Sequence, residues 1–209
     1  MSDCRIQTYT GIYFDVLEPN PNDVNIEDIA HAISNQCRFT GHVKTFYSVA
    51  EHSVRASYLV PKELALCALM HDATEAYLVD LPSPIKRHSE LGKYFRPIEN
   101  TLWQAIATHF NLPLEIPKEV HDVDNIMLLT EKRDLMDGNK GMSDYARKWV
   151  VGDGLEPLET TIVPCLPETA EKAFLIRFGL LTDSLWPLCT YCYSYTKSPL
   201  QEDLYPVCC

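Results

Sequence analysis

Hydrophobic positions recur with a helical period along most of the chain. Between Ile26 and Cys37 they fall at i, i+3, i+4, i+7 and i+11, which predicts an amphipathic helix with Asn25 as its N-cap. The same period predicts further helices over 47–60, 62–78, 90–110, 117–137 and 168–181. Pro82 and Pro84 end the 62–78 helix, and the Gly- and Pro-punctuated residues 138–166 are expected to be irregular.

The N-terminal segment has a different pattern. Residues 5–17 are rich in β-branched and aromatic types and are interrupted by Gly11, which predicts a short β-hairpin. We therefore expect an all-α fold, a helical bundle over 25–181 with an N-terminal β-hairpin. Residues 182–209 hold four of the eight cysteines, little charge and no sustained period. We interpret them as a partly ordered, Cys-rich extension of a domain that spans 1–181.

Composition narrows the class of protein. Of the 209 residues, 46% are hydrophobic and 22% are charged, which excludes disordered, collagen-like and coiled-coil classes. No uncharged apolar run approaches the roughly 18 residues of a membrane helix, and the first residues lack a signal-peptide layout. We expect a soluble, cytoplasmic protein without a membrane partner. The net charge of −11 argues against binding of long nucleic acids, but a few local cations and a metal could still hold a small phosphate ester.

The cysteines predict neither disulfides nor a strong zinc site. A disulfide framework is not expected without a secretory signal, and Cys37 and Cys67 lie on apolar helical stripes, where they read as small buried hydrophobes. A Cys4 zinc site is conceivable in the extension, but the spacing of its last two cysteines is poor for zinc ligands. The four residues concerned are Cys189, Cys192, Cys208 and Cys209.

Four polar residues stand where the helical period expects core residues. His71 and Asp72 fall among the apolar residues of the third predicted helix, whereas His52 and Asp124 lie on the apolar faces of the second and fifth. A buried Asp is costly unless it is paired or bound to a metal. One inward His is more often a hydrogen-bonded core residue than a ligand, but four such residues on three helices favour a metal. Two imidazoles and two carboxylates suit Zn²⁺, Mn²⁺, Co²⁺ or Fe²⁺.

Two more acids follow the His-Asp pair. Glu75 shares the helix face of His71 and Asp72, and Asp80 lies just past the predicted end of that helix. Neither is needed as a metal ligand. Both could orient or deprotonate a water molecule and protonate a leaving oxygen, although solvated acids at a helix end are the ordinary alternative.

These residues, in this order, resemble the H…HD…D signature of the HD-domain metal-dependent phosphohydrolases. Within that family, the strings SVAEHS (48–53) and LMHDATEAYLVDLPSPIK (69–86) resemble the YfbR-like bacterial 5′-deoxynucleotidases. The segment from Cys37 to Ala50 is still more similar to the DatZ-type dATP triphosphohydrolases of bacteriophages. The resemblance covers residues 8–181.

The resemblance implies a role for each matching residue. One divalent transition metal (Zn, Co or Mn) would be held by His52, His71, Asp72 and Asp124. Glu75 and Asp80 would form the acid–base pair. Substrate phosphate would be contacted by Arg38, with Lys44 and Lys86 as weaker candidates. The base would pack near Phe14, Ile29 or Ile33.

A second metal site is not expected in the protein itself. Three further histidines lie between Asp72 and Asp124 in the sequence, but none falls on the apolar face of a predicted helix as His52 does. They are His88, His109 and His121. Mg²⁺ could instead arrive on the substrate phosphates. The resemblance also implies a homo-oligomer, a dimer or a hexamer, whose partner molecule is a small deoxynucleotide.

The expected activity is hydrolysis of 2′-deoxynucleotides at the α-phosphate, first of all dATP to deoxyadenosine and triphosphate, and also dADP and dAMP. One alternative keeps the chemistry but changes the substrate, to any deoxynucleoside monophosphate or to a guanosine alarmone. Another is a catalytically inactive, metal-stabilised HD binding module. The presence of both Glu75 and Asp80 disfavours that last alternative, because a purely structural metal site does not need them.

Overall fold

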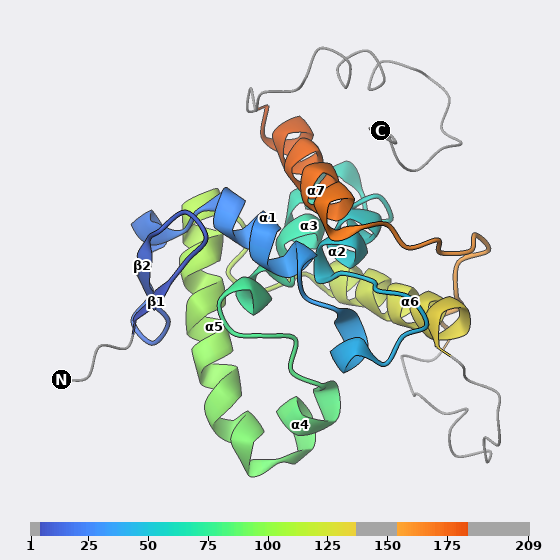
Figure 1. Cartoon of the computed structure of the whole chain (residues 1–209), viewed down its shortest axis with the longest axis horizontal. Helices are drawn as coiled ribbons and strands as arrows, with labels where there is room; N and C mark the ends of the chain where they lie inside the picture. The colour runs from blue at the N-terminus through green and yellow to red at the C-terminus, as the bar shows by residue number, and fades with distance from the viewer. Residues whose placement is uncertain (1–4, 137–153, 184–209) are drawn as a thin grey trace.

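The computed structural model describes residues 5–136 and 154–183, and within these ranges the chain is mostly helical (Figure 1). None of the described helices has the length and apolar character that crossing a membrane requires. The α-helices and strands follow one another as β1 (Arg5–Gln7), β2 (Tyr13–Asp15), α1 (Ile26–Ser34), α2 (Val49–Ser57), α3 (Ala65–Met70), α4 (Ser83–His88), α5 (Glu90–Phe110), α6 (Lys118–Leu135) and α7 (Pro167–Thr182). Short 3-10 turns interleave with them as η1 (Pro21–Asp23), η2 (Arg38–Gly41), η3 (Lys62–Leu64) and η4 (Ala73–Ala76). The expected all-α fold with an N-terminal hairpin is confirmed.

The hairpin forms where the sequence predicts it. Strands β1 and β2 pair antiparallel, with Ile6 opposite Phe14. Gly11, in the connection, has φ +90°, a conformation that residues with a side chain rarely adopt. Phe14 points into the core and is fully buried, so the hairpin is anchored to the helices through its second strand.

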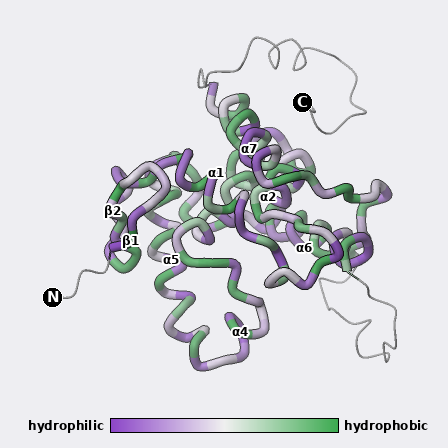
Figure 2. Tube along the Cα trace, viewed as in Figure 1, coloured by the Kyte–Doolittle hydropathy of each residue, from purple (hydrophilic) through white to green (hydrophobic). Residues whose placement is uncertain are grey.

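The helices pack around one core that extends from α1 to α7. Asn25 caps α1 as expected, because its side chain accepts a hydrogen bond from the backbone N–H of Glu27 at 2.8 Å. Helix α7 packs against α1, α2 and α3, which lie beside it in Figure 1. Figure 2 shows hydrophobic and hydrophilic positions alternating along α1 and α7, as expected for helices with one buried face. This packing fixes α2 and α3, the two helices that lead to the polar cluster described below.

The predicted helix over 62–78 is wrong, because the chain breaks it into η3, α3 and η4. Residues His71 and Asp72 lie at the break, not inside a helix. Asp72 has φ −98° and ψ 11°, in the sparsely populated bridge region where active-site residues are often found. The period did not reveal the break because buried residues on both sides, such as Leu69 and Ala73, face the same core.

Two other boundaries differ from the prediction at the ends of α1 and α2. Helix α1 ends at Ser34, where the Oγ of Ser34 and the Nδ2 of Asn35 both donate to the carbonyl of His31 and so compete with the next helical turn. Cys37 is therefore a half-buried residue paired with Ser48 in an isolated bridge, not part of a helical stripe. Helix α2 spans Val49–Ser57 only, shorter than the predicted 47–60.

Helix α4 was not expected, because Pro82 and Pro84 were interpreted as the end of a helix. Pro84 instead occupies the first turn of α4, where a missing N–H costs nothing. Helix α5 matches the predicted 90–110, with the Ser89 side chain as its N-cap. Its first half is less buried than expected, since Leu91 is 54% and Tyr94 72% exposed. In Figure 1 this half of α5 and α4 lie together, away from α7.

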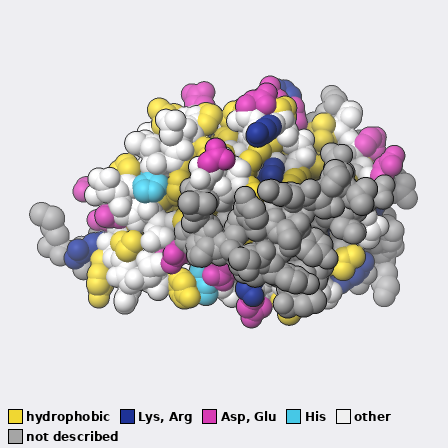
Figure 3. Space-filling model, turned by 90° about the horizontal axis from the view of Figure 1, so that it is seen from above, with side chains coloured by type: hydrophobic (Ala, Val, Ile, Leu, Met, Phe, Trp, Pro, Cys, Tyr) yellow, Lys and Arg dark blue, Asp and Glu magenta, His cyan; other side chains and the backbone are white. Residues whose placement is uncertain are grey.

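Helices α6 and α7 agree with the predicted 117–137 and 168–181 to within two residues at each end. Cys67 is buried as expected. The tail cysteines that were weighed as a zinc site lie outside the described residues, as do Cys4 and much of the segment expected to be irregular. Figure 3 shows acidic and basic side chains interspersed over the described part of one face, so charge is dispersed there.

Candidate metal centre

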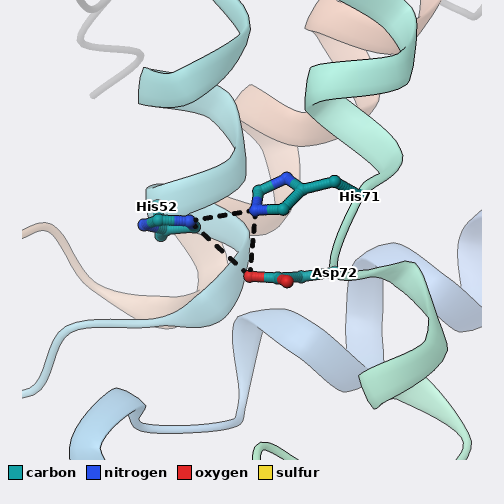
Figure 4. Close-up of side chains that lie close together, drawn as sticks. All are labelled: His52, His71 and Asp72. Atoms are coloured by element: carbon teal, nitrogen blue, oxygen red, sulfur yellow. Dashed lines mark hydrogen bonds and ion pairs between the residues drawn. The ribbon is translucent and has the colours of Figure 1, made fainter. Parts of the chain in front are cut away.

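Three elements bring two histidines and two aspartates together. His52 comes from the middle of α2, His71 and Asp72 from the break after α3, and Asp124 from α6. The Nε2 atoms of the two histidines are 3.2 Å apart, and the Oδ2 of Asp72 lies 3.6 Å from that of His52 and 3.3 Å from that of His71 (Figure 4). The Oδ1 of Asp124 lies 3.2 Å from the His52 Nε2 and 3.8 Å from the His71 Nε2. Ligand atoms of His52, His71 and Asp72 all lie within 4.8 Å of one another, close enough to hold one metal ion.

Each imidazole is oriented by an acceptor on its far side. The Nδ1 of His52 lies 2.6 Å from the Oε1 of Glu131, and the Nδ1 of His71 lies 2.7 Å from the carbonyl oxygen of Ala68. We assign the proton of each ring to Nδ1, because an N–H there can donate to these oxygens. Each Nε2 is then free of that proton and faces the cluster, as in histidines whose second nitrogen is held by a carboxylate or a carbonyl.

The charges of the cluster suit a divalent cation. Burial alone would raise the pKa of Asp72, but the charges of His71 and His52 outweigh it and lower that pKa. Burial likewise opposes ionisation of Asp124, but the same two histidines outweigh it and hold the pKa of Asp124 well below its usual range. Burial and Arg38 would lower the pKa of His52, but Glu131 and Asp124 raise it to about 10. A pKa this high means that, without a cation, His52 carries a second proton on Nε2 in addition to the one on Nδ1. A metal ion can replace this second proton.

Arg38 bridges the cluster and its supporting carboxylate. Its Nη1 lies 3.2 Å from the Oδ2 of Asp72, and its Nε lies 3.2 Å from the Oε2 of Glu131. Arg38 is 8% exposed, and Glu131 is fully buried. Burial would lower the pKa of Arg38, but Glu131, Asp72 and Asp124 raise it, so the guanidinium stays charged. A buried cation in this position compensates carboxylates that would otherwise be costly to bury.

Glu75 lies beside the cluster in a less charged setting. It is 5% exposed, its Oε1 lies 3.8 Å from the Nζ of Lys86, and its Oε2 has no hydrogen-bond partner among the described residues. Burial, and after it the negative charges of Asp72 and Asp80, raise the pKa of Glu75 well above its usual value. The surroundings of Glu75 therefore favour its neutral, protonated form, whereas those of Asp72 and Asp124 favour the ionised form. Two carboxyl groups with pKa values pushed in opposite directions are typical of acid–base sites.

Comparison with known proteins gives a family but no function. No protein-family model matches the sequence. The chain is 41% identical over 179 residues to the uncharacterized protein YfdR of Escherichia coli (strain K12), a match that covers 85% of this chain and 96% of that protein. The chain belongs to the YfdR family. An uncharacterized protein of Rhodobacter capsulatus is 35% identical over 120 residues, which are 53% of this chain and 60% of the relative.

Three residues expected to pack on a base lie in the core of this YfdR-family chain. Phe14, Ile29 and Ile33 are fully buried in the main hydrophobic core, and the ring of Phe14 stacks on that of Tyr77 at 4.1 Å. Their side chains are enclosed by the core in this structure, and their packing on a base stays a prediction. Periodicity marks buried positions but does not distinguish a core from the wall of a binding site.

The basic residues expected near phosphate lie in different places. Lys86 is close to Glu75, as described, and its Nζ also lies 2.7 Å from the Oε1 of Glu99. The Nζ of Lys44 instead lies 3.4 Å from the carbonyl oxygen of Asp134 near the end of α6. In this YfdR-family protein Arg38 thus contacts the cluster directly, through Asp72. Lys86 contacts Glu75 beside the cluster, and the contact described for Lys44 is with α6.

The histidines considered for a second metal are spread over the surface. His88 is exposed at the end of α4, His121 is exposed on α6, and the Nδ1 of His109 lies 2.7 Å from the carbonyl oxygen of Pro21. None of them belongs to the group of described residues that could hold a metal ion.

Sequence reasoning missed Glu131, the carboxylate that holds both His52 and Arg38. A pattern that could have revealed it is present: Glu131 follows Asp124 by seven residues and the buried Met127 by four, so all three share one face of α6. Gln36 was missed as well. Its side chain contacts the backbone of Glu75 and Asp80, and nothing in the spacing of the sequence indicates that contact.

Proposed function

We propose that this YfdR-family protein is an HD-type metal-dependent phosphohydrolase that acts on 2′-deoxynucleotides at the α-phosphate. The proposal is carried by one observation, the convergence of two inward imidazoles and two carboxylates beside the buried carboxyl group of Glu75. A structural metal site requires the ligands but has no use for such an acid. The proposed cofactor is a single Zn²⁺, Co²⁺ or Mn²⁺ ion.

His52, His71, Asp72 and Asp124 would hold the metal. This donor set fits such an ion, because mixed nitrogen and oxygen ligands with two negative charges suit divalent cations of intermediate softness. The ion would supply Lewis acidity at the phosphate and lower the pKa of a nearby water molecule. Glu131 and the Ala68 carbonyl keep both imidazoles in the ligating tautomer.

The acid–base step falls to Glu75 and Asp80. In the reaction, the oxygen of water bonds to the α-phosphorus, the bond from phosphorus to the 5′-oxygen breaks, and that oxygen takes up a proton. Glu75 can supply this proton, because burial and its acidic neighbours keep its carboxyl group protonated. Asp80, the second carboxyl group, would orient the attacking water and accept its proton. With dATP the products are deoxyadenosine and triphosphate.

Arg38 and Lys86 would balance the charge on the phosphoryl oxygens. Arg38 uses Nε and Nη1 in its two ion pairs, and a guanidinium has further N–H donors that can face a phosphate. Lys86 lies next to Glu75, where the leaving oxygen would be protonated. The choice of deoxyadenylates is supported by the resemblance of residues 37–86 to DatZ-type and YfbR-like enzymes.

The proposal is tested by measuring phosphate and triphosphate release from dNTPs, dNMPs and ribonucleotides with Zn²⁺, Co²⁺ or Mn²⁺. We expect turnover of dATP that chelators abolish. Asp124→Asn should lose both bound metal and turnover, whereas the matched variant Asp122→Asn, at a half-buried position of α6 where the side chain pairs with Lys118, should keep both. No turnover by the metal-loaded protein would exclude an enzyme acting on these substrates, and activity confined to ribonucleotides would exclude the deoxynucleotide assignment.

A further inference from the structure

The side-chain amide of Gln36 is used at both ends, and each end contacts the backbone of a different acid. Its Nε2 donates to the carbonyl oxygen of Glu75 at 2.8 Å. Its Oε1 accepts from the backbone N–H of Asp80 at 3.3 Å. One side chain thus connects the two residues that act as acid and base in the proposed function.

Gln36 is itself held in place by the segment that leads into α2. Its carbonyl oxygen accepts from the N–H of Val49 at 3.1 Å, and two residues later the N–H of Arg38 donates to the carbonyl of Tyr47 at 2.9 Å. Between these two bonds, Cys37 pairs with Ser48. The backbone of residues 36–38 therefore has a fixed position. From it, the Gln36 side chain contacts the segment that carries Glu75 and Asp80, and the Arg38 side chain contacts Asp72 of the candidate metal centre.

The segment that carries the two acids has mainly local backbone bonds. The N–H groups of Tyr77 and Leu78 donate to the carbonyl of Thr74, and that of Leu81 donates to the carbonyl of Val79. Packing of η4 against α1 and α5, and of Tyr77 on Phe14, places the start of the segment. The short-range bonds shape the turns but do not fix where residues 79–81 lie relative to the rest of the chain. The contacts with Gln36 span 39 and 44 residues, so they can fix this placement.

We propose that Gln36 is a positioning residue that sets the places of Glu75 and Asp80 relative to Arg38 and the metal ligands. The inference rests on the proposed function, since it assumes that these two acids act on one substrate. An amide suits this task because it offers a donor and an acceptor on one rigid plane, and here each faces its complement. Gln36 does not touch the reacting atoms; it acts through the two acids.

The test replaces Gln36 by methionine, which has a similar length but neither hydrogen bond. We expect Gln36→Met to lower kcat by about 10- to 100-fold, as displacements of catalytic groups near 1 Å do, with KM and bound metal unchanged. Asn35→Leu is the matched control, because it removes a neighbouring amide whose Nδ2 donates to the carbonyl of His31 at the end of α1. This control should keep the wild-type kcat.

Hydrogen exchange of a peptide that covers 77–81 supplies a readout that does not depend on activity. Exchange in this peptide should become faster in Gln36→Met and stay unchanged in Asn35→Leu. Unchanged exchange, or an unchanged kcat in an active and metal-loaded Gln36→Met protein, would overturn the inference. If the wild-type protein hydrolyses none of the nucleotides, the proposed function fails, and the exchange result alone decides whether Gln36 holds the segment.

Discussion

The buried carboxylate of Glu131 offers the sharpest test of how the candidate metal centre is supported. Glu131→Gln keeps the size of the side chain but removes its negative charge. An amide has one oxygen, so it cannot accept both from the His52 Nδ1 at 2.6 Å and from the Arg38 Nε at 3.2 Å. One of these two donors then faces the amide nitrogen, and the His52 ring loses the acceptor that fixes its tautomer.

The expected magnitude follows from the two roles of the carboxylate. Loss of a partner that orients a ligating histidine typically weakens metal binding by about 10- to 100-fold, or about 1.4 to 2.8 kcal/mol. Removal of one partner of a buried ion pair costs about 3–5 kcal/mol of folding free energy. Because typical domains unfold with about 5–15 kcal/mol, the variant should remain folded but be measurably less stable.

The assay combines metal competition against a chromophoric chelator with urea denaturation in the presence of EDTA. Glu119→Gln is the matched control, because the same change is made at an exposed position of α6. Glu131→Asp separates the two roles: it keeps the charge, so stability falls less, but its shorter side chain should still weaken metal binding. A folded Glu131→Gln protein with the metal affinity of the wild type would refute the reasoning.

Three further predictions concern protons and packing. The pKa of His52 is raised to about 10 and that of His71 is raised too, so metal binding at neutral pH should displace protons from these rings. Calorimetry in two buffers should show proton release and an affinity that rises with pH, and a buffer-independent heat would contradict this. Glu75→Gln should lower kcat by about 10²- to 10⁴-fold with bound metal unchanged, and wild-type activity should fall as pH rises through the raised pKa of Glu75; equal rates for both proteins would exclude Glu75 as the acid. Phe14→Ala should cost about 3–5 kcal/mol of folding free energy in urea denaturation without altering preference among bases, and a selective change of base preference would restore a role for it in binding.

Helices could be predicted from the sequence wherever capping residues lie at both ends of a long run of hydrophobic positions with helical spacing. Helix α5 matches its expected bounds because Ser89 caps its start and Asn111, in a left-handed conformation, ends it. The break at His71 could not be predicted, since a 3-10 turn and an α-helix can bury the same apolar residues and tertiary contacts decide between them. Pro84 was misinterpreted because a proline that ends one helix and a proline in the first turn of the next look alike in a sequence.

The candidate site was predictable to the extent that its residues break a pattern. His52 and Asp124 are polar residues at helix positions where the sequence period predicts buried apolar side chains. The structure brings both of them to the His71–Asp72 pair. Glu131 is likewise a polar residue at a buried position of α6, but its role is to orient His52 and not to act as a proposed ligand. Nothing in the sequence distinguishes Gln36 from other loop residues, since half-buried amide side chains are common in loops. Long-range contacts of that kind become visible only when the chain is folded.

The packing of α7 has a consequence for the order in which the protein can assemble during synthesis. Helix α7 covers α1, α2 and α3, yet it begins at Pro167, more than forty residues after Asp124, the last proposed ligand. A ribosome adds about 5–20 residues per second, so the nascent chain carries all four ligands for seconds before α7 can close over the helices that hold them. During that interval the core is incomplete, and a chain truncated before α7 should leave apolar surface of α1 and α2 exposed to chaperones. Binding of the proposed metal in its final geometry would therefore come late in the synthesis and folding of the chain.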